Sequence, residues 1–401
     1  MKVAGRPDLG HLTYCTNIHA GESWPEVFAN LERYMPAVKR QVAPDRALGV
    51  GLRLSAIAAA ALREPAAIEE LKDFLTGHDL YVFTINGFPY GPFHGRPVKE
   101  QVYQPDWRTE ERVLYSDRLA DLLAELLPDD AGLEGSVSTV PGTFKPLAEA
   151  PGAIEHMARN LIRHAAHLAR IRERTGRTVA LALEPEPCCF LETIDETVGF
   201  FEQHLYGAAA VRQLSELTGL APAAAEVALH RHLGVCYDVC HAAVEFEDPA
   251  GSLQALRAAG IGVPKLQLSA ALRIAAVGPE TAGQLRPFDE PVYLHQVIAR
   301  HDGQLTRHVD LPEALEALAQ NRGAEWRVHF HVPIFLEQLQ DFSTTQAFLG
   351  EILALHRREP ISAHLEVETY TWDVLPERYR QVDVASAIAR ELAWVIEQLA
   401  A

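Results

Sequence analysis

Carboxylates and histidines stand at the ends of several short apolar runs in this sequence. In chain order they are Glu184, Asp238, His241, His329, His331, Glu366 and Glu368. Apolar runs of roughly four to eight residues are typical of buried strands, so each run would bring its polar residue to one rim of the fold. An acid and an imidazole held close together at strand ends make either a metal site or a general acid/base site.

A divalent cation, Zn²⁺, Mn²⁺ or Mg²⁺, suits such a mixed set of oxygen and imidazole ligands. Taken alone, Glu184 could be a solvated rim residue and His331 a hydrogen-bonded core histidine. The joint pattern favours a metal site, because buried strands seldom end in acids or histidines unless something compensates their charge. The expected metal ligands are Glu184, Asp238, Gln267, His331 and Glu368.

Strand parity decides which of these side chains point inward. Glu366 and Glu368 share one face of their run, and Glu368 is the better ligand because it lies nearer the C-terminal end of the strand. The same reasoning places His331 nearer the rim than His329 and leaves open which of the two is a ligand.

Two residues have less certain roles in this constellation. Gln267 points inward on the run 265–268 and could coordinate a metal through its amide oxygen. His241 follows Asp238 by three residues and could either ligate the metal or bind substrate and transfer protons.

Aromatic residues gather at the same expected rim. The Gly- and Pro-rich stretch 87–95 follows a strand candidate, and loops of this composition usually line a site. Rings beside carboxylates can hold a small polyol or another polar ring, although a packed barrel mouth would look the same in sequence. The expected substrate contacts are Asn86, Phe88, His94, Lys99, His329, Tyr370 and Trp372.

Composition excludes several classes of protein. The 401 residues are 48% hydrophobic, with no low-complexity tract, so the chain can bury a large core. A formal net charge of −18 argues against a nucleic-acid partner, since phosphate binding depends on Lys and Arg. No apolar run is long enough to cross a membrane, and the first residues lack the apolar centre of a secretory signal, so we expect a cytoplasmic protein. Five cysteines, an odd number, do not indicate a disulfide framework.

Strand and helix patterns alternate along the whole chain without a run of consecutive strands. This alternation predicts parallel strands joined by helices. Because the polar strand ends fall on many different strands, we expect a closed (β/α)8 TIM barrel rather than an open doubly wound sheet. There are nine strand candidates for eight places, and residues 12–19, 265–269 or 326–332 could be the extra one. We expect one domain over 1–401 with an insertion around 278–308, which could form a hairpin of 292–299 against 304–309.

The order of the acids and histidine resembles the xylose isomerase-like barrel superfamily of sugar isomerases, epimerases and endonuclease IV relatives. Many of those enzymes hold a metal by Glu, Asp, His and Glu on the last four strands, and the His after Asp-x-x contacts substrate. Glu184, Asp238, His241 and Glu368 match that pattern in this sequence. Gln267 stands where a metal-binding His would be expected, so either Gln267 replaces it or His331 supplies it.

Six motifs together resemble the EboE family more closely. They are YCTNIH at 14–19, TINGFPYG at 84–91, LEPEP at 183–187, YDVCH at 237–241, HFHVP at 329–333 and EVETYTW at 366–372. That family is described as a metabolite traffic protein, encoded in a bacterial cluster linked to the export of secondary-metabolite precursors. The resemblance implies a barrel, a small-molecule metabolite and other proteins of such a cluster as partners.

Three functions compete on this sequence. The first is a metal-dependent isomerase or epimerase of a polyhydroxylated small molecule, with Glu184 and Glu368 as bases and His241 assisting proton transfer. The second is a metabolite-binding or traffic protein that keeps the pocket without turnover, with which Gln267 is compatible. The third, an endonuclease IV-like repair enzyme, would need more histidines and a less acidic chain.

Overall fold

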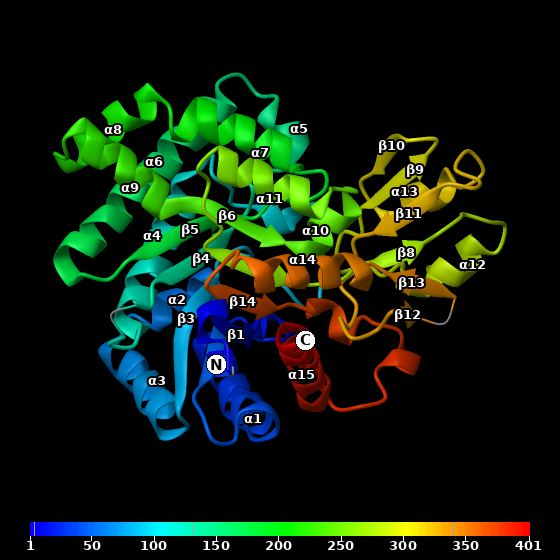
Figure 1. Cartoon of the computed structure of the whole chain (residues 1–401), viewed down its shortest axis with the longest axis horizontal. Helices are drawn as coiled ribbons and strands as arrows, with labels where there is room; N and C mark the ends of the chain where they lie inside the picture. Colours follow the sequence, from blue (N-terminus) through cyan, green and yellow to red (C-terminus); the bar gives the residue numbers. More distant parts are fainter. Residues whose placement is uncertain (4, 131, 340) are drawn as a thin grey trace.

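Eight parallel strands form the central sheet of the protein (Figure 1). The computed structural model describes residues 1–3, 5–130, 132–339 and 341–401. The strands are β1 His11–Tyr14, β2 Leu48–Arg53, β3 Leu80–Asn86, β4 Gly135–Thr139, β5 Val179–Leu183, β6 Leu233–Asp238, β7 Lys265–Leu268 and β14 His364–Val367. Their order is β1-β14-β7-β6-β5-β4-β3-β2. The expected α/β barrel is therefore confirmed.

A threonine side chain holds the seam of the barrel between β1 and β2. Thr13 Oγ1 donates a hydrogen bond to the Gly49 carbonyl (2.7 Å) and accepts one from the Gly51 amide (3.0 Å). A parallel bridge between Cys15 and Gly51 continues the pairing. Gly51 has no room for a side chain, because a Cβ there would come within 1.9 Å of Glu366 Oε2.

Helices follow the strands and cover the outside of the barrel (Figure 1). They are α1 Trp24–Val42, α2 Ala56–Ala61, α3 Pro65–Gly77, α4 Glu110–Leu126, α5 Lys145–Ala148, α6 Ala153–Thr175, α7 Ile194–Phe200, α8 Ala208–Thr218, α9 Pro222–His232, α10 Val239–Val244, α11 Pro249–Ala258, α14 Gln346–Arg358 and α15 Val384–Ala400. In α6, the residues Met157, Leu161, Ala165 and Leu168 form the buried stripe that their spacing predicts. Within the described residues, none of the helices has both the length and the apolar content to cross a bilayer.

A second, antiparallel sheet is inserted between β7 and α14. Its strands are β8 Leu272–Ile274, β9 Val297–His301, β10 Gln304–His308, β11 Glu325–Val328, β12 Gln338–Leu339 and β13 Phe342–Thr344, in the order β10-β9-β11-β8-β13-β12. The inserted segment also carries α12 Thr281–Leu285 and α13 Leu311–Glu316. Figure 1 shows this sheet at one end of the barrel, beside α10 and α14.

The expected insertion around 278–308 was too short, since the inserted sheet begins at Leu272 and ends at Thr344. The ninth strand candidate, 326–332, belongs to this sheet as β11 and ends at Val328. The expected hairpin is present as β9 paired with β10. In contrast to that hairpin, β11 pairs with β8 at a distance of more than fifty residues in sequence and leaves no local signal.

The interior of the barrel carries a buried ion pair. Lys265 Nζ lies 2.6 Å from Glu366 Oε1, and both side chains are fully buried. Although burial alone lowers the pKa of Lys265, the Glu366 carboxylate raises it above its ordinary value. Lys265 is therefore a fixed positive charge in the barrel, below the strand ends.

We expect Lys265→Met to destabilise the protein by about 3–5 kcal/mol, because it leaves the Glu366 carboxylate buried without a partner. Urea unfolding followed by circular dichroism measures the change. Replacing both partners, as Lys265→Met with Glu366→Gln, should restore at least half of the loss. If Lys265→Met lowered the unfolding free energy by less than about 1 kcal/mol, Lys265 would not be the main group that neutralises the Glu366 carboxylate.

Candidate functional site

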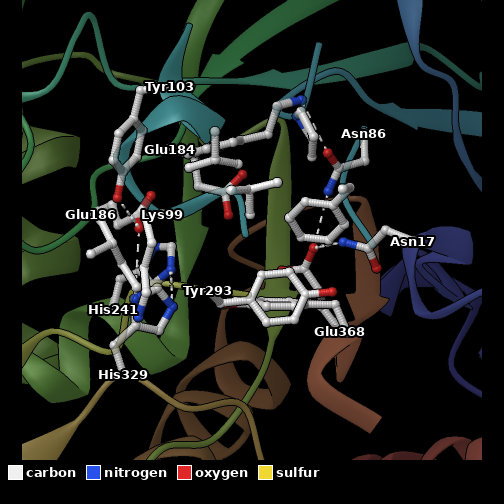
Figure 2. A pocket seen from close by; sticks show the side chains of 17 residues that line it. Asn17, Asn86, Lys99, Tyr103, Glu184, Glu186, His241, Tyr293, His329 and Glu368 are labelled. Carbon is white, nitrogen blue, oxygen red and sulfur yellow. Dashed lines mark hydrogen bonds and ion pairs between the residues drawn. The ribbon is translucent and has the colours of Figure 1, made fainter. Parts of the chain in front are cut away.

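A cavity opens at the C-terminal ends of the barrel strands. Barrel residues form one part of its wall, and the segment after β3 and the inserted sheet form the rest. Figure 2 shows Glu368 with Asn17 and Asn86 on one side of the cavity, and Glu186 with Tyr103, His241 and His329 on the other. The end of the barrel that bears the site is the end where the enzymes of this architecture place their chemistry.

Three buried carboxylates meet at the strand ends, and two of them, Glu184 and Glu368, line this cavity. Glu184 follows β5, Asp238 ends β6 and Glu368 follows β14. Each offers an oxygen that lies within 4.8 Å of an oxygen of the other two. The structure therefore brings together the three acids that the sequence predicts as ligands.

Each of two carboxylates is held through one oxygen. Glu368 Oε1 accepts hydrogen bonds from Asn17 Nδ2 (2.6 Å) and Asn86 Nδ2 (3.1 Å). Asp238 Oδ1 accepts from Ser269 Oγ (2.6 Å) and from the His241 amide (3.1 Å), so Asp238 both ends β6 and caps α10. This cap explains the spacing of three residues between Asp238 and His241.

Two oxygens of this acidic cluster lack hydrogen-bond partners among the described residues. Within the described part of the chain, neither Glu184 Oε2 nor Asp238 Oδ2 has a hydrogen-bond partner, although both are buried. A buried acceptor without a partner costs free energy, which a bound cation would recover. These two atoms show that the residues present fit a metal ion.

Burial and mutual repulsion raise the pKa values in the cluster. Burial, followed by the charges of Glu368 and Asp238, raises the pKa of Glu184 well above its ordinary value. Burial raises the pKa of Glu368 to about 7, with Asp238 adding to the shift and His331 and Gln267 opposing it. Three carboxylates this close cannot all be ionised in a dry cavity unless a positive charge joins them.

Gln267 lies among the acids as the sequence predicts. On β7 it pairs in register with Asp238 on one side and with Glu366 on the other. Its fully buried amide lies beside Glu368 and lowers the pKa of that acid. Neither amide atom makes a hydrogen bond of good geometry among the described residues, so its oxygen is available to a metal.

Three histidines form a second cluster next to the acids. His241 Nε2 lies 3.1 Å from His329 Nε2, which lies 3.2 Å from His331 Nε2. Burial is the main cause that lowers the pKa of each ring. His329 and His331 stand just past the end of β11, not within a strand as expected, yet both rings reach the same cluster.

Five of the seven expected substrate contacts line the cavity: Asn86, Phe88, Lys99, His329 and Tyr370. Trp372 is buried and His94 is half-buried, and neither is part of its lining. Lys99 Nζ forms an ion pair with Asp310 Oδ2 (2.6 Å), so its charge fastens the segment after β3 to the inserted sheet. Its role toward a substrate stays a prediction, as do those of the other six residues.

Several lining residues escaped the sequence reasoning. Glu186 Oε1 accepts hydrogen bonds from Tyr103 OH (2.7 Å) and Gln296 Nε2 (3.1 Å), and burial raises its pKa to about 7 despite both bonds. Glu186 could have been found, because it has the same parity as Glu184. Tyr293, which also lines the cavity, and Gln296, which holds Glu186, could not be found, since they lie in the inserted segment.

Glu391 on α15 supports the site from outside the cavity. One of its oxygens accepts hydrogen bonds from Thr369 Oγ1 (2.7 Å), next to Glu368, and from the Ile334 amide (3.2 Å) of the inserted segment. Burial raises its pKa to about 7, although both hydrogen bonds oppose the shift. A single carboxyl group thus joins the last helix to both parts of the site wall.

Scans of protein-family models and of curated proteins found no match. Among solved structures, a xylose isomerase-like TIM barrel protein from Mycobacterium smegmatis, in complex with magnesium, shares 11% identity over 97% of this chain and 96% of its own, with a TM-score of 0.50. The probable 3-DHS dehydratase AsbF from Bacillus anthracis shares 13% identity over 96% and 97% of the two chains, with a TM-score of 0.47. A structure of the IOLI protein with a bound zinc atom shares 14% over 96% and 97%, with a TM-score of 0.43.

The first of these structures shows the fold alone, which is that of the xylose isomerase-like TIM barrels. The other two superpose less closely and support no argument here. Since no family model matches, the resemblance to the EboE family stays a prediction.

Glu391 makes the stability of the metal-free protein depend on pH. Its folded pKa of about 7 exceeds its ordinary value of 4.5, so its contribution is full below pH 4.5 and is lost as the pH rises through 7. Between those pH values we expect the wild type to lose on the order of 3 kcal/mol of unfolding free energy through Glu391, and we expect Glu391→Gln not to show this loss. Urea unfolding at pH 5 and pH 8 measures the difference in unfolding free energy. Glu351→Gln, at an exposed position of α14, is the control and should behave like wild type. Parallel pH profiles of Glu391→Gln and wild type would contradict this assignment.

Proposed function

We propose that this chain is a metal-dependent enzyme of the isomerase or epimerase type that acts on a small polyhydroxylated molecule. The observation that carries the proposal is the group of three buried carboxylates from three different strand ends. Two of them, Glu184 and Asp238, each have a buried oxygen without a hydrogen-bond partner among the described residues. Enzymes that move a proton next to a carbonyl need a positioned base and a charge that stabilises the resulting oxyanion. The cavity offers residues for both tasks.

Glu184, Asp238, Gln267, His331 and Glu368 would hold the ion. When bound, a divalent cation would polarise a carbonyl or hydroxyl oxygen of the substrate. Among oxygen ligands Mg²⁺ and Mn²⁺ are well suited to the carboxylate group, and Zn²⁺ also accepts carboxylates.

Glu368 is the best placed base. Asn17 and Asn86 fix one of its oxygens, so the carboxylate can present the other to a substrate without reorienting. Burial raises the pKa of Glu368 to about 7 in the metal-free cavity, and a bound cation would lower it, so the carboxylate would be ionised and able to accept a proton at neutral pH. Glu184, on the other side of the cluster, would act as the second base. The neutral ring of His241 would assist proton transfer between substrate oxygens.

Aromatic side chains would bind the body of the substrate. Phe93, Tyr293 and Tyr370 pack against one another, with ring centroids 5.0–5.3 Å apart, and all three line the cavity. Such a wall can pack against one face of a sugar-like ring and exclude water from the acids.

A non-catalytic metabolite-binding protein is the second candidate. Gln267 favours it, because a neutral amide is a weaker metal ligand than the histidine that the superfamily resemblance leads one to expect at this strand. This role would suit the metabolite traffic context of the EboE resemblance, including partners from an export cluster. The two candidates differ in whether the bound molecule is chemically changed.

We expect Glu184→Gln to weaken Mn²⁺ binding roughly tenfold or more, because it removes one charged oxygen ligand from the acidic cluster. Electron paramagnetic resonance of tag-free, chelator-treated protein titrated with Mn²⁺ reports the free ion directly. Glu351→Gln, an exposed exchange of the same type on α14, should bind like wild type. Equal affinity in Glu184→Gln and wild type would remove the carboxylate cluster as the metal site.

Turnover is tested by hydrogen exchange. Incubated with Mn²⁺ and a panel of ketoses and cyclic polyol ketones in D₂O, the wild type should incorporate deuterium next to the carbonyl of at least one compound, as seen by proton NMR. Glu368→Gln should lower that rate by roughly 10²–10⁴, the usual contribution of a general base. Saturable binding of a compound without exchange would favour the binding protein instead.

A further inference from the structure

Glu186 lines the cavity but is not one of the three clustered carboxylates. It lies on the side of Tyr103 and His329, across the cavity from Glu368 (Figure 2). Its side chain is buried, and only 6% of the residue is exposed. The proposed function gives this acid no role, although a buried carboxylate is costly unless another group pairs with it.

One oxygen of Glu186 is held by hydrogen bonds and the other is not. Oε1 accepts hydrogen bonds from Tyr103 OH (2.7 Å) and Gln296 Nε2 (3.1 Å). Oε2 has no hydrogen-bond partner among the described residues, and no lysine or arginine there forms an ion pair with Glu186. His329 Nδ1 lies 3.6 Å from Glu186 Oε1, and it already lies 2.7 Å from Gln296 Oε1. The Glu186 carboxylate is therefore fixed in orientation, and its charge is not paired.

Among the described residues, the rest of the cavity wall offers no lysine or arginine to pair with Glu186. Lys99 is the single lysine or arginine in that lining, and its ammonium is paired with Asp310 Oδ2 (2.6 Å). A divalent ion held by the three clustered carboxylates would neutralise at most two of their charges. The charge of Glu186 then remains in excess. It opposes a phosphate or carboxylate group on the substrate and favours an ammonium group.

Aromatic rings share the cavity wall with Glu186. Tyr103, whose hydroxyl binds the carboxylate, packs edge to face against Phe88, with ring centroids 6.0 Å apart. Tyr293 and Tyr370, with ring centroids 5.0 Å apart, line the same cavity. The face of an aromatic ring attracts an ammonium group, and the attraction is stronger where water is excluded. A fixed carboxylate in such a wall suits an ammonium group, whereas a neutral hydroxyl group would leave the charge of the acid unpaired.

We propose that the substrate carries an ammonium group, which Glu186 binds through Oε2 beside the aromatic wall. Compounds of this class are amino sugars and amino cyclitols. The inference deepens the proposed function and rests on it for the polyhydroxylated body of the substrate. Glu368 acts at the carbonyl end of the substrate, and Glu186, on the other side of the cavity, selects the amine end (Figure 2). Glu186 is thus a specificity-determining residue that takes no part in the proton transfer.

Binding of matched sugars tests the proposal. The probes are D-glucose, its 2-amino, 3-amino and 6-amino derivatives, and glucose 6-phosphate. Each is titrated at pH 7 into tag-free protein in excess Mg²⁺ and followed by isothermal titration calorimetry. At least one amine should bind roughly 10- to 100-fold more tightly than D-glucose, the usual gain from a hydrogen bond to a charged group. Glucose 6-phosphate should bind no better than D-glucose. If no amine binds more tightly than D-glucose, the proposal is wrong.

Glu186→Gln should remove the higher affinity for the amine. The exchange keeps an oxygen for Tyr103 and Gln296, so the melting temperature should stay close to that of wild type. Glu186→Asp, which keeps the charge, should retain part of the preference for the amine. Glu100→Gln removes the same charge at an exposed position of the segment that carries Tyr103, and it should bind like wild type. An unchanged preference in Glu186→Gln would overturn the proposal.

Glu184→Gln distinguishes Glu186 from the clustered carboxylates, and it should keep the preference for the amine. If Glu184→Gln lost that preference and Glu186→Gln kept it, the ammonium group would bind at the cluster, and the proposal would be overturned.

Failure of this inference and failure of the proposed function give different results. If no compound exchanges deuterium while the preference for the amine depends on Glu186, the proposed enzyme fails and this inference stands. If neutral compounds exchange deuterium and no amine binds more tightly, the proposed function stands and this inference fails.

Discussion

The site depends on a crowding of negative groups that the barrel itself cannot neutralise. Glu184, Asp238 and Glu368 are all nearly inaccessible to water and lie within one ligand sphere of each other. The buried positive charge nearby is Lys265, and its ammonium is already paired with Glu366. Burial and three neighbouring acids raise the pKa of Glu184, and Lys265 lowers it only in part. The surrounding residues therefore leave a net demand for a cation at the cavity.

The topology explains why these particular acids meet. In a parallel barrel the carboxyl ends of all strands open on one rim, so a polar residue placed just after an apolar strand reaches the same cavity from any strand. The supporting residues use the same rule, since Asn17 lies just beyond β1 and Asn86 ends β3. Each holds the same oxygen of Glu368, so the orientation of one acid depends on three strands.

Sequence reasoning was sufficient where local pattern and topology agree. Glu184, Asp238 and Glu368 could be predicted to lie together because each ends an apolar run and parallel strands share a rim. The inserted sheet could not be delimited, since β8, β12 and β13 have only two or three residues each, and β8 pairs with β11 and β13 at a distance of more than fifty residues in sequence. For that reason the sequence did not predict that Gln296, which orients His329, belongs to the site. His329 and His331 were predicted to share one face because they are two residues apart.

The inserted sheet changes what the barrel can bind. At β7 this chain has the buried, neutral amide of Gln267. The imidazoles of His329 and His331 lie on the segment that follows β11 of the inserted sheet. The His329 ring contacts both His241 and His331. The acids are thus fixed by the barrel and two of the three histidines by the insertion. A change in how the insertion packs, for example at the Lys99–Asp310 ion pair, would move one half of the site and leave the other in place.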